Sequence, residues 1–375
     1  MLIRCTKKLL DKLNIKAGEN IEGDPLFSWH ANLITMSRRK AVVLVNDRNR
    51  YVIVLYGLNA QDFKELDDHI REAIRETFQE EGIKNEIIDK YINHSKEIYY
   101  TKTKDRKSVA RMNKSCETVH YLEDYVLEDR INQSTLNNRA SRLLVGDGPR
   151  KYIEPHEELY KDLEGFAGQP VIGCKALELK VNLNLWNHNI WRRIVVPANI
   201  TFDRLHEVLQ VSFGWKDCHL HEFFIYSDEE IDNDLSINHP GYHKEGYKPV
   251  VNLVCSEEDF LEYENDMPII IEKGVKLSDY LSAKMKYNYD YGDNWQHYIE
   301  VEKTIEECDR NYPFCIDGEG NTPPEDVGGE QGFEEFLEII NDKKHPEHEN
   351  MVNWGRRQGY EEFDIDMVNR KLKTR

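Results

Sequence analysis

Residues 284–303 read KMKYNYDYGDNWQHYIEVEK, and this stretch predicts a β-hairpin. Aromatic and apolar residues alternate on both sides of Gly292-Asp293-Asn294, whose residue types are common in tight turns. With a three-residue loop, the predicted cross-strand pairs are Tyr291 with Trp295, Tyr289 with His297 and Tyr287 with Ile299. A histidine among these rings is either a core residue with satisfied hydrogen bonds or part of a site.

The sequence around this hairpin predicts a second domain over residues 173–375. Two alternating stretches, 176–185 (ALELKVNLNL) and 190–197 (IWRRIVVP), are typical of β-strands. Residues 200–215 (ITFDRLHEVLQVSFGW) predict an amphipathic helix, and residues 219–226 (HLHEFFIY) predict a third strand. This order indicates an α+β fold in which a mixed, β-grasp-like sheet packs on one main helix.

The first part of the chain predicts a smaller α+β domain over residues 1–145. Two continuous apolar runs, 42–45 and 52–55, indicate a sheet that is covered on both faces. Apolar residues recur at helical spacing from Phe63 to Phe78. Residues 146–172 hold Gly and Pro at both ends, which predicts the connection between the two domains.

Length and composition limit the class of protein. A chain of 375 residues is long for one core, so two domains are expected. No apolar run approaches the length of a membrane span, and the charged start MLIRCTKKLLDKLN does not resemble a secretory signal. The seven cysteines are odd in number and include no C-x-x-C pair, which favours reduced thiols and a cytoplasmic location.

Charge is distributed unevenly along the chain. Residues 1–150 carry 26 Lys+Arg and 23 Asp+Glu, a net charge of +3, so the remainder has a net charge of −22. The acidic part suits a protein or small-molecule partner, whereas nucleic acid requires a local basic patch. Residues 102–114 hold six positive charges and one negative, and form either a solvated helix face or a phosphate-contacting patch. The candidates for nucleic-acid contacts are Arg38, Arg39, Lys40, Lys102, Lys104, Arg106, Lys107 and Arg111.

A metal site can be built from three separate segments. His219 and His221 are two apart on a predicted strand, so both are expected on one face of the sheet. The hairpin and the loop CIDGEGNTPPEDVGG, which includes Glu325 and Asp326, could add further ligands for zinc or iron. An open coordination position would activate water for hydrolysis. The candidate metal ligands are His219, His221, Asp293, His297 and Cys315.

The same segments can instead form a polar pocket without metal, or a packed core. Aromatic residues at a period of two are typical of a core, and histidines in a packed sheet often bond to backbone or carboxylates. Residues 323–326 followed by Gly328-Gly329 indicate a rigid turn whose glycines permit positive φ. The pocket candidates are His219, His221, Tyr289, Asp290, Asp293, Trp295, His297, Glu325 and Asp326.

Several of these motifs together resemble a known family. Residues 174–373 resemble the plasmid Ri ORF-3-like family, also labelled TnpR-like passenger proteins of insertion elements. The matching stretches are, in order, LNLWNHNIWRRIVVPANITFDRLHEVLQVSFGW, HLHEF, YDYGDNWQH, CIDGEGNTPPEDVGG and HPEHENMVNWG. Near the C-terminus, WGRRQGYEEFDIDMVN departs from the family's usual FDPEAFDLEEVN. The N-terminal part resembles a bacterial domain of unknown function.

The resemblance implies an α+β fold and a bacterial, often mobile-element, context, but no established reaction. Three hypotheses follow. The favoured one is a binding protein whose acidic C-terminal domain recognises a partner or small ligand through the polar pocket. The alternatives are a metal-dependent hydrolase or nuclease, and a nucleic-acid-binding accessory protein.

Overall fold

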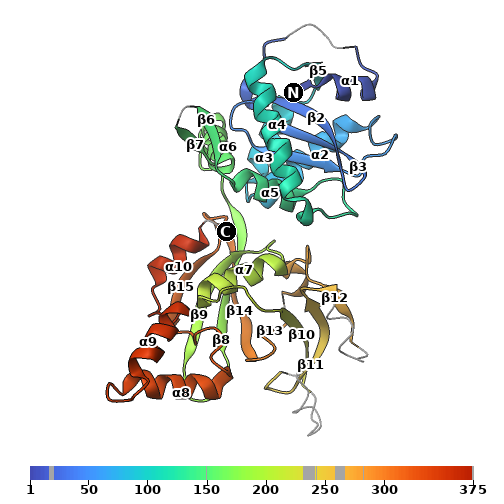
Figure 1. Cartoon of the computed structure of the whole chain (residues 1–375). Helices are drawn as coiled ribbons and strands as arrows, with labels where there is room; N and C mark the ends of the chain where they lie inside the picture. Colours follow the sequence, from blue (N-terminus) through green and yellow to red (C-terminus); the bar gives the residue numbers. More distant parts are fainter. Residues whose placement is uncertain are drawn as a thin grey trace. The chain divides into compact units, whose positions relative to one another are not determined.

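The computed structural model describes residues 1–16, 21–148, 150–230, 241, 243–257, 267–281 and 283–373. The chain divides into two units, residues 1–173 and 174–375, each with its own sheet and helices (Figure 1). The predicted α+β architecture with two units is therefore confirmed. Within the described residues, no helix is both long and apolar enough to cross a bilayer.

The first unit is built on a five-stranded sheet. Its strand order is β4 (Val52–Tyr56), β3 (Arg39–Asn46), β2 (Ser28–Met36), β1 (Leu2–Cys5) and β5 (Tyr99–Lys102). β1 runs parallel to both of its neighbours, and the other pairs are antiparallel. The β-branched runs on β3 and β4 are buried throughout, which confirms that both faces of this sheet are covered.

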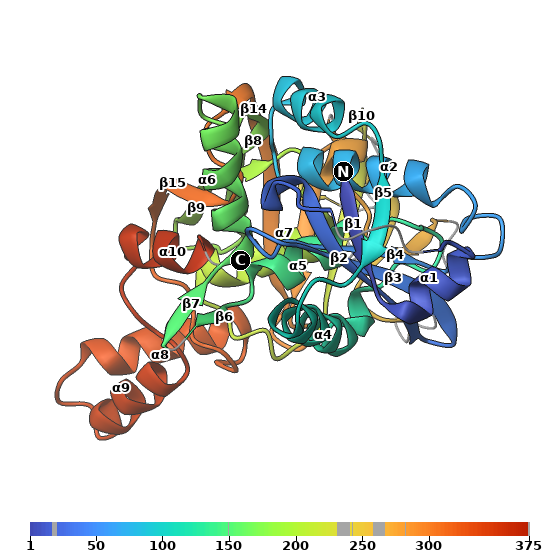
Figure 2. The same cartoon turned by 90° about the horizontal axis from the view of Figure 1, so that it is seen from above.

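Helices cover the two faces of this sheet. The helices of the unit are α1 (Lys7–Leu13), α2 (Leu66–Glu80), α3 (Asn85–His94), α4 (Arg106–Tyr121), α5 (Ser134–Arg142) and α6 (Pro155–Ala167), with short 3-10 turns at Pro25–Phe27 and Glu123–Tyr125. One hydrophobic cluster joins the sheet to α1, α2, α3 and α6, and a second joins it to α4 and α5. Figure 2 shows α3 and α4 on opposite sides of the sheet.

Residues 146–172 belong to the first unit, so the prediction that they connect two domains is wrong. The segment contains the end of β6 (Val145–Gly148), which pairs with β7 (Lys151–Ile153), and all of α6. Leu159 and Leu163, one helical turn apart on α6, are buried in the core shared with α2 and α3. Pro155 begins α6 and Gly168, with φ of 76°, ends it, so these two residues mark the ends of a helix inside the unit.

The second unit contains an eight-stranded mixed sheet. Its order is β12 (Ile269–Ile271), β11 (Tyr247–Val254), β10 (His221–Glu230), β13 (Met285–Tyr289), β14 (Trp295–Cys308), β8 (Cys174–Leu183), β9 (Ile190–Pro197) and β15 (Phe314–Glu319). Among the described strands of this sheet, only β11 and β12 pair in parallel. The sequence predicted the hairpins β8–β9 and β13–β14, but not the three strands β11, β12 and β15 that widen the sheet.

The main helix of this unit is α7 (Phe202–Phe213), which lies across the sheet (Figure 1). Phe202, Leu205 and Leu209 are fully buried in the core, as expected for its apolar face. The chain ends with α8 (Gly329–Asn341), α9 (His348–Arg357) and α10 (Ile365–Leu372), and a short 3-10 turn occupies Leu277–Tyr280. Asn369 of α10 is hydrogen-bonded to both backbone groups of Cys315 on β15.

The β13–β14 hairpin has a longer loop than predicted. Tyr289 pairs with Trp295, and Tyr287 pairs with His297, so the register differs by two residues from the expected one. The loop spans residues 290–294, because Asp290 accepts hydrogen bonds from the backbone N–H groups of residues 292 and 293 and closes the turn. A shift of two residues preserves the alternation of faces, so the same rings reach the core. Tyr291 lies outside the strand and is exposed.

Candidate functional site

Three loops of the second unit meet around the side chain of His219. This residue lies between α7 and β10, Asp290 lies between β13 and β14, and Glu325 and Asp326 lie between β15 and α8. Backbone hydrogen bonds hold the loops together: the N–H of Asp290 donates to the carbonyl of Leu220 at 3.1 Å. The meeting of these three segments is the arrangement that the sequence motifs predicted, although only some of the named residues take part.

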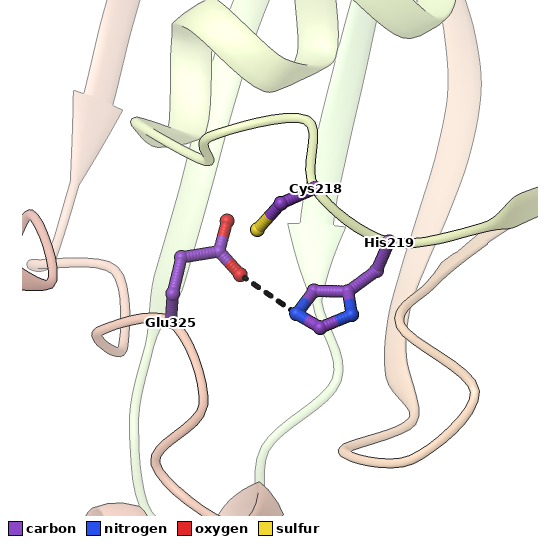
Figure 3. Close-up of side chains that lie close together, drawn as sticks. All are labelled: Cys218, His219 and Glu325. Carbon is purple, nitrogen blue, oxygen red and sulfur yellow. Dashed lines mark ion pairs between the residues drawn. The ribbon is translucent and has the colours of Figure 1, made fainter.

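Carboxylates surround one nitrogen of His219. Its Nε2 lies 2.9 Å from Oδ1 of Asp326, 3.5 Å from Oδ2 of Asp290 and 3.8 Å from Oε2 of Glu325. Figure 3 shows the imidazole turned toward Glu325, with Cys218 beside them. The Asp326 side chain is 55% exposed, whereas that of Glu325 is 1% exposed. The cluster therefore has one face toward solvent and one in the protein interior.

Glu325 is the buried member of this cluster. Its Oε1 accepts hydrogen bonds from the backbone N–H of Lys216 at 2.7 Å and from the hydroxyl of Tyr289 at 3.0 Å. Its Oε2 is buried and has no hydrogen-bond partner among the described residues. Burial raises the pKa of Glu325 above its ordinary value. A positive charge near Oε2 would stabilise the ionised form of this side chain.

The backbone is strained where two of the carboxylates are placed. Asp290 has φ of 57° and Asp326 has φ of 58°, in the left-handed region that costs a non-glycine residue roughly 1 kcal/mol. Gly328 and Gly329 also have positive φ, of 92° and 68°, which confirms the role predicted for these glycines. A Cβ atom at Gly329 would lie 3.1 Å from the carbonyl oxygen of Asp293, so the two loops approach closely at this point.

The donor atoms of this cluster suit a divalent cation. The ligand atoms of His219, Asp290 and Asp326 all lie within 4.8 Å of one another, and those of Cys218, His219 and Glu325 do so as well. One imidazole with carboxylates is a ligand set used for zinc, iron and manganese. Burial and Glu325 raise the pKa of the Cys218 thiol, so the oxygen ligands are better suited than sulfur to an incoming cation.

His221 belongs to a different cluster, and the predicted pairing of His219 with His221 is not observed. His221 stacks on His206 with ring centres 3.5 Å apart, and its Nε2 lies 2.8 Å from Oε1 of Glu272. Neither metal-compatible group of His219 includes it. The rule that residues two apart share a face applies within a strand, and β10 begins only at His221, after His219.

The structure places His297 in the core rather than in the site. Its Nδ1 lies 3.3 Å from the carbonyl oxygen of Tyr287, and its Nε2 accepts a hydrogen bond from the indole N–H of Trp215 at 3.3 Å. Burial lowers the pKa of His297 to about 3, so the ring is neutral. Both nitrogens are engaged, which contradicts the predicted role as a metal ligand. The predicted pocket residue Trp295 is also buried and stacks on Trp215.

Two other predicted ligands have structural contacts. Asp293 accepts a hydrogen bond from the backbone N–H of Gly328 at 3.1 Å and so joins two of the three loops. Cys315 is buried, and its thiol donates to the carbonyl of Asp317 at 3.2 Å. Cys315 therefore packs within the β15 segment, and Asp293 supports the site from outside its centre.

Sequence reasoning missed the cluster of His206, His221 and Glu272. His206 contacts the hydroxyl of Tyr287 at 2.8 Å and Oδ1 of Asp217 at 2.9 Å. Burial raises the pKa of Glu272 to about 8. The sequence contained a signal for this cluster. Glu272 directly follows the apolar run at 269–271, a position where burial is expected, and a buried carboxyl group needs a partner.

The basic residues of the first unit form two separate groups. Arg38, Arg39 and Lys40 lie at the β2–β3 turn, where the neighbouring Ser37 hydroxyl donates to the carboxylate of Glu123, just after α4. The other candidates lie near the start of α4. Lys102 and Lys104 come before the helix, Arg106 and Lys107 lie in its first turn, and Arg111 lies about one turn later. The 16 residues of α4 separate the two groups by roughly 24 Å at 1.5 Å per residue, so they do not form one patch.

Comparisons with known proteins find a matching family model for each unit. A family model described as plasmid pRiA4b ORF-3-like protein matches residues 175–372, and a domain of unknown function, DUF6933, matches residues 2–158. The uncharacterized protein y4hQ of Sinorhizobium fredii is 33% identical over 184 residues, which cover 48% of this chain and 81% of that protein.

A solved structure is similar as well. The crystal structure of a protein of unknown function, MM3350 from Methanosarcina mazei Go1, has 35% sequence identity and a TM-score of 0.40. The match covers 51% of this chain and 96% of that one. The names of these relatives describe no activity, but the ORF-3-like model spans more than half of the chain. This protein therefore belongs to the plasmid pRiA4b ORF-3-like family.

Proposed function

We propose that this is a binding protein that holds a divalent cation at His219, Asp290 and Asp326, with Glu325 beside them. The observation that carries the proposal is the position of three carboxylates around one imidazole nitrogen, with a buried carboxylate oxygen of Glu325 that has no hydrogen-bond partner among the described residues. Like charges at this separation repel one another, and a cation between them removes the repulsion.

The exposure of the cluster supports a role in binding a ligand or partner. The Asp326 side chain is 55% exposed and that of His219 is 30% exposed, so a cation here would face solvent on one side. A cation held by three or four protein atoms keeps open positions. An oxygen atom of a small molecule or of a partner protein would occupy such a position. Zinc, iron and manganese all accept this set of ligands.

Metal content is the direct test. Protein purified without a histidine tag is analysed by mass spectrometry, before and after reconstitution with Zn²⁺, Fe²⁺ or Mn²⁺. The wild type is expected to hold near-stoichiometric metal, and His219→Gln is expected to lose it. His188→Gln is a matched control, because the His188 side chain is 27% exposed and contacts one carboxylate, Glu334, at 3.1 Å. The proposal fails if the reconstituted wild type holds no metal, or if His219→Gln holds as much.

Metal-dependent hydrolysis is a second candidate function. The exposed side of the cluster could hold a metal-bound water, whose pKa the cation would lower. The hydroxyl of Tyr289 contacts Glu325 next to this position. The test is turnover of chromogenic phosphodiester and phosphomonoester substrates by the metal-loaded protein. Turnover that Asp326→Asn abolishes would support hydrolysis, whereas bound metal without turnover would support the binding role alone.

A cytoplasmic location and a mobile-element context are part of this proposal. All seven cysteines lie among the described residues and none of them forms a disulfide, which supports a reducing compartment. The family description names a plasmid, which supports the mobile-element context.

A further inference from the structure

Arg50 has an unusual position in the first unit. It follows the turn between β3 and β4 with φ of 67°, a backbone conformation that glycine adopts without cost. The residue is only 4% exposed. One guanidinium nitrogen donates to the carbonyl of Gly146, while Nε has no hydrogen-bond partner among the residues that the structure describes. Because the backbone would favour glycine, the reason for an arginine here must lie in its side chain.

Arg50 lines a small cavity between the β3–β4 turn and α4. The other polar residues that line the cavity are His30, Asn46, Asp47, Ser108 and Arg111. The volume is ≈ 10 Å³, which is room for about one water-sized atom. His30 donates from Nδ1 to Asp47 at 2.5 Å and accepts at Nε2 from the backbone N–H of Lys104 at 3.3 Å. The imidazole is therefore held in one orientation at the wall of the cavity.

The charges around this cavity do not balance. Asp47 is paired with Arg4 at 3.0 Å. Asp147 is shared between Arg111 and Lys151. Among the described residues, no carboxylate forms an ion pair with Arg50. These groups carry four positive and two negative charges, and burial together with the neighbouring Arg111 lowers the pKa of Arg50. Lys151 is exposed and Arg111 is partly buried, but Arg50 is buried, and a buried positive charge is costly without an anion.

We propose that this cavity receives one oxygen atom of a phosphate group, which Arg50 and Arg111 hold with the hydroxyl of Ser108. Guanidinium groups bind phosphate oxygens through several aligned N–H donors, which the unpartnered Nε of Arg50 can supply. The remaining phosphate oxygens would lie outside the small cavity, beside the half-buried Arg111 and Ser108. The ligand is either free phosphate or a small phosphate monoester.

A larger hollow borders the same turns of α4 and favours a monoester. It has a volume of ≈ 400 Å³ and is lined by Thr103, Lys104, Asp105, Arg106, Val109, Ala110 and Asn113. Its two basic side chains, Lys104 and Arg106, are among the candidates that the sequence gave for nucleic-acid contacts. The apolar side chains of Val109 and Ala110 would contact the organic part of the ligand.

The test is isothermal titration calorimetry of the full chain with inorganic phosphate and with adenosine monophosphate. The buffer has fixed ionic strength and contains a chelator, so that phosphate does not bind through metal in the second unit. Arg50→Gly removes the guanidinium and also relieves the left-handed backbone, so the variant is expected to fold. Lys107→Gln is the control, because Lys107 is exposed on the first turn of α4 and lines neither hollow.

The wild type and Lys107→Gln are expected to bind with saturation, and Arg50→Gly is expected to bind about tenfold more weakly or worse. If circular dichroism shows that Arg50→Gly is unfolded, Arg111→Gln takes its place with the same expected loss. Tighter binding of the monoester would identify the ligand as a phosphate ester, and equal binding would identify free phosphate. The absence of saturable binding of either ligand, or equal binding by the folded Arg50 and Arg111 variants, would overturn the proposal.

Discussion

His219 and Asp326 are 107 positions apart in the chain, yet Nε2 of one lies 2.9 Å from Oδ1 of the other. The contact joins the loop before β10 to the loop before α8. Asp290, from a third loop, lies 3.5 Å from the same nitrogen. Three loops that are remote in sequence therefore place their charged atoms together.

Asp326→Asn should weaken metal binding without unfolding the loop. Asparagine tolerates the left-handed φ of 58° at this position, so the change removes a charge and keeps the backbone. Affinity for the bound cation is expected to fall by more than about tenfold, measured by competition with a chromogenic chelator. Asp217→Asn is the matched control, because Asp217 has φ of 56° and contacts His206 at 2.9 Å, outside the cluster. Equal losses in both variants would count against a site at Asp326.

Glu272→Gln should change how stability depends on pH. Burial raises the pKa of Glu272 from 4.5 to about 8. As pH rises, the unfolded chain therefore loses this proton at a lower pH than the folded chain does. The wild-type second unit is therefore expected to lose stability between about pH 4.5 and pH 8, by an amount on the order of a few kcal/mol. The variant should lack this loss. The difference between its free energy of unfolding and that of the wild type should therefore grow in favour of the variant toward pH 8.

Urea denaturation at a series of pH values measures this effect. Five of the six tryptophans lie in residues 174–375, so intrinsic fluorescence reports mainly on the second unit. Parallel pH profiles for the wild type and Glu272→Gln would show that this carboxyl group is not the cause.

His297→Gln should make the second unit less sensitive to acid. The folded ring has its pKa lowered to about 3 from 6.5, so the unfolded chain takes up the proton first as pH falls. The wild type is expected to lose stability between about pH 6.5 and pH 3, and the variant to lose less over that range. At pH 7 the variant should be less stable by about 1 to 3 kcal/mol, because it disturbs the hydrogen bonds to Trp215 and Tyr287. Fluorescence-detected denaturation at pH 7 and pH 5 measures the stability at neutral pH and its loss on acidification. A variant that loses as much stability as the wild type between these pH values would contradict the lowered pKa of His297.

Glu81→Gln should strongly destabilise the first unit. Glu81 is fully buried, binds both terminal nitrogens of Arg142 at 2.8–2.9 Å and accepts hydrogen bonds from Tyr51 and Tyr160. The variant leaves the partly buried guanidinium of Arg142 without its counter-charge, and the loss of one partner of a buried pair typically costs about 3 to 5 kcal/mol. Differential scanning calorimetry of the full chain should show a lower unfolding temperature for the first unit. The control is Asp68→Asn, which removes the exposed partner of Arg71 and should cost less than about 1 kcal/mol.

Local patterns in the sequence predicted much of the fold. The alternating strands β8 and β9, the amphipathic α7 and the buried runs of β3 and β4 each depend on residues close together in the chain, and the structure contains all of them. The same kind of reasoning failed for α6, because the Gly and Pro residues at its ends were taken as a domain boundary rather than as turns inside the unit. It also gave the β13–β14 hairpin a loop two residues too short, since the hydrogen bonds of Asp290 that set the turn cannot be read from residue types alone.

The sequence by itself determined the family, the α+β class and the three segments that supply the candidate site. Only the tertiary structure decided which side chains meet there. In the folded protein, His219 contacts Asp290, Glu325 and Asp326. His221 instead contacts Glu272, and His297 is buried in the core. The physical reason is that strand periodicity sets which way a side chain points only within a strand. The direction of a loop side chain depends on the turn and on contacts with remote loops, which local sequence does not encode.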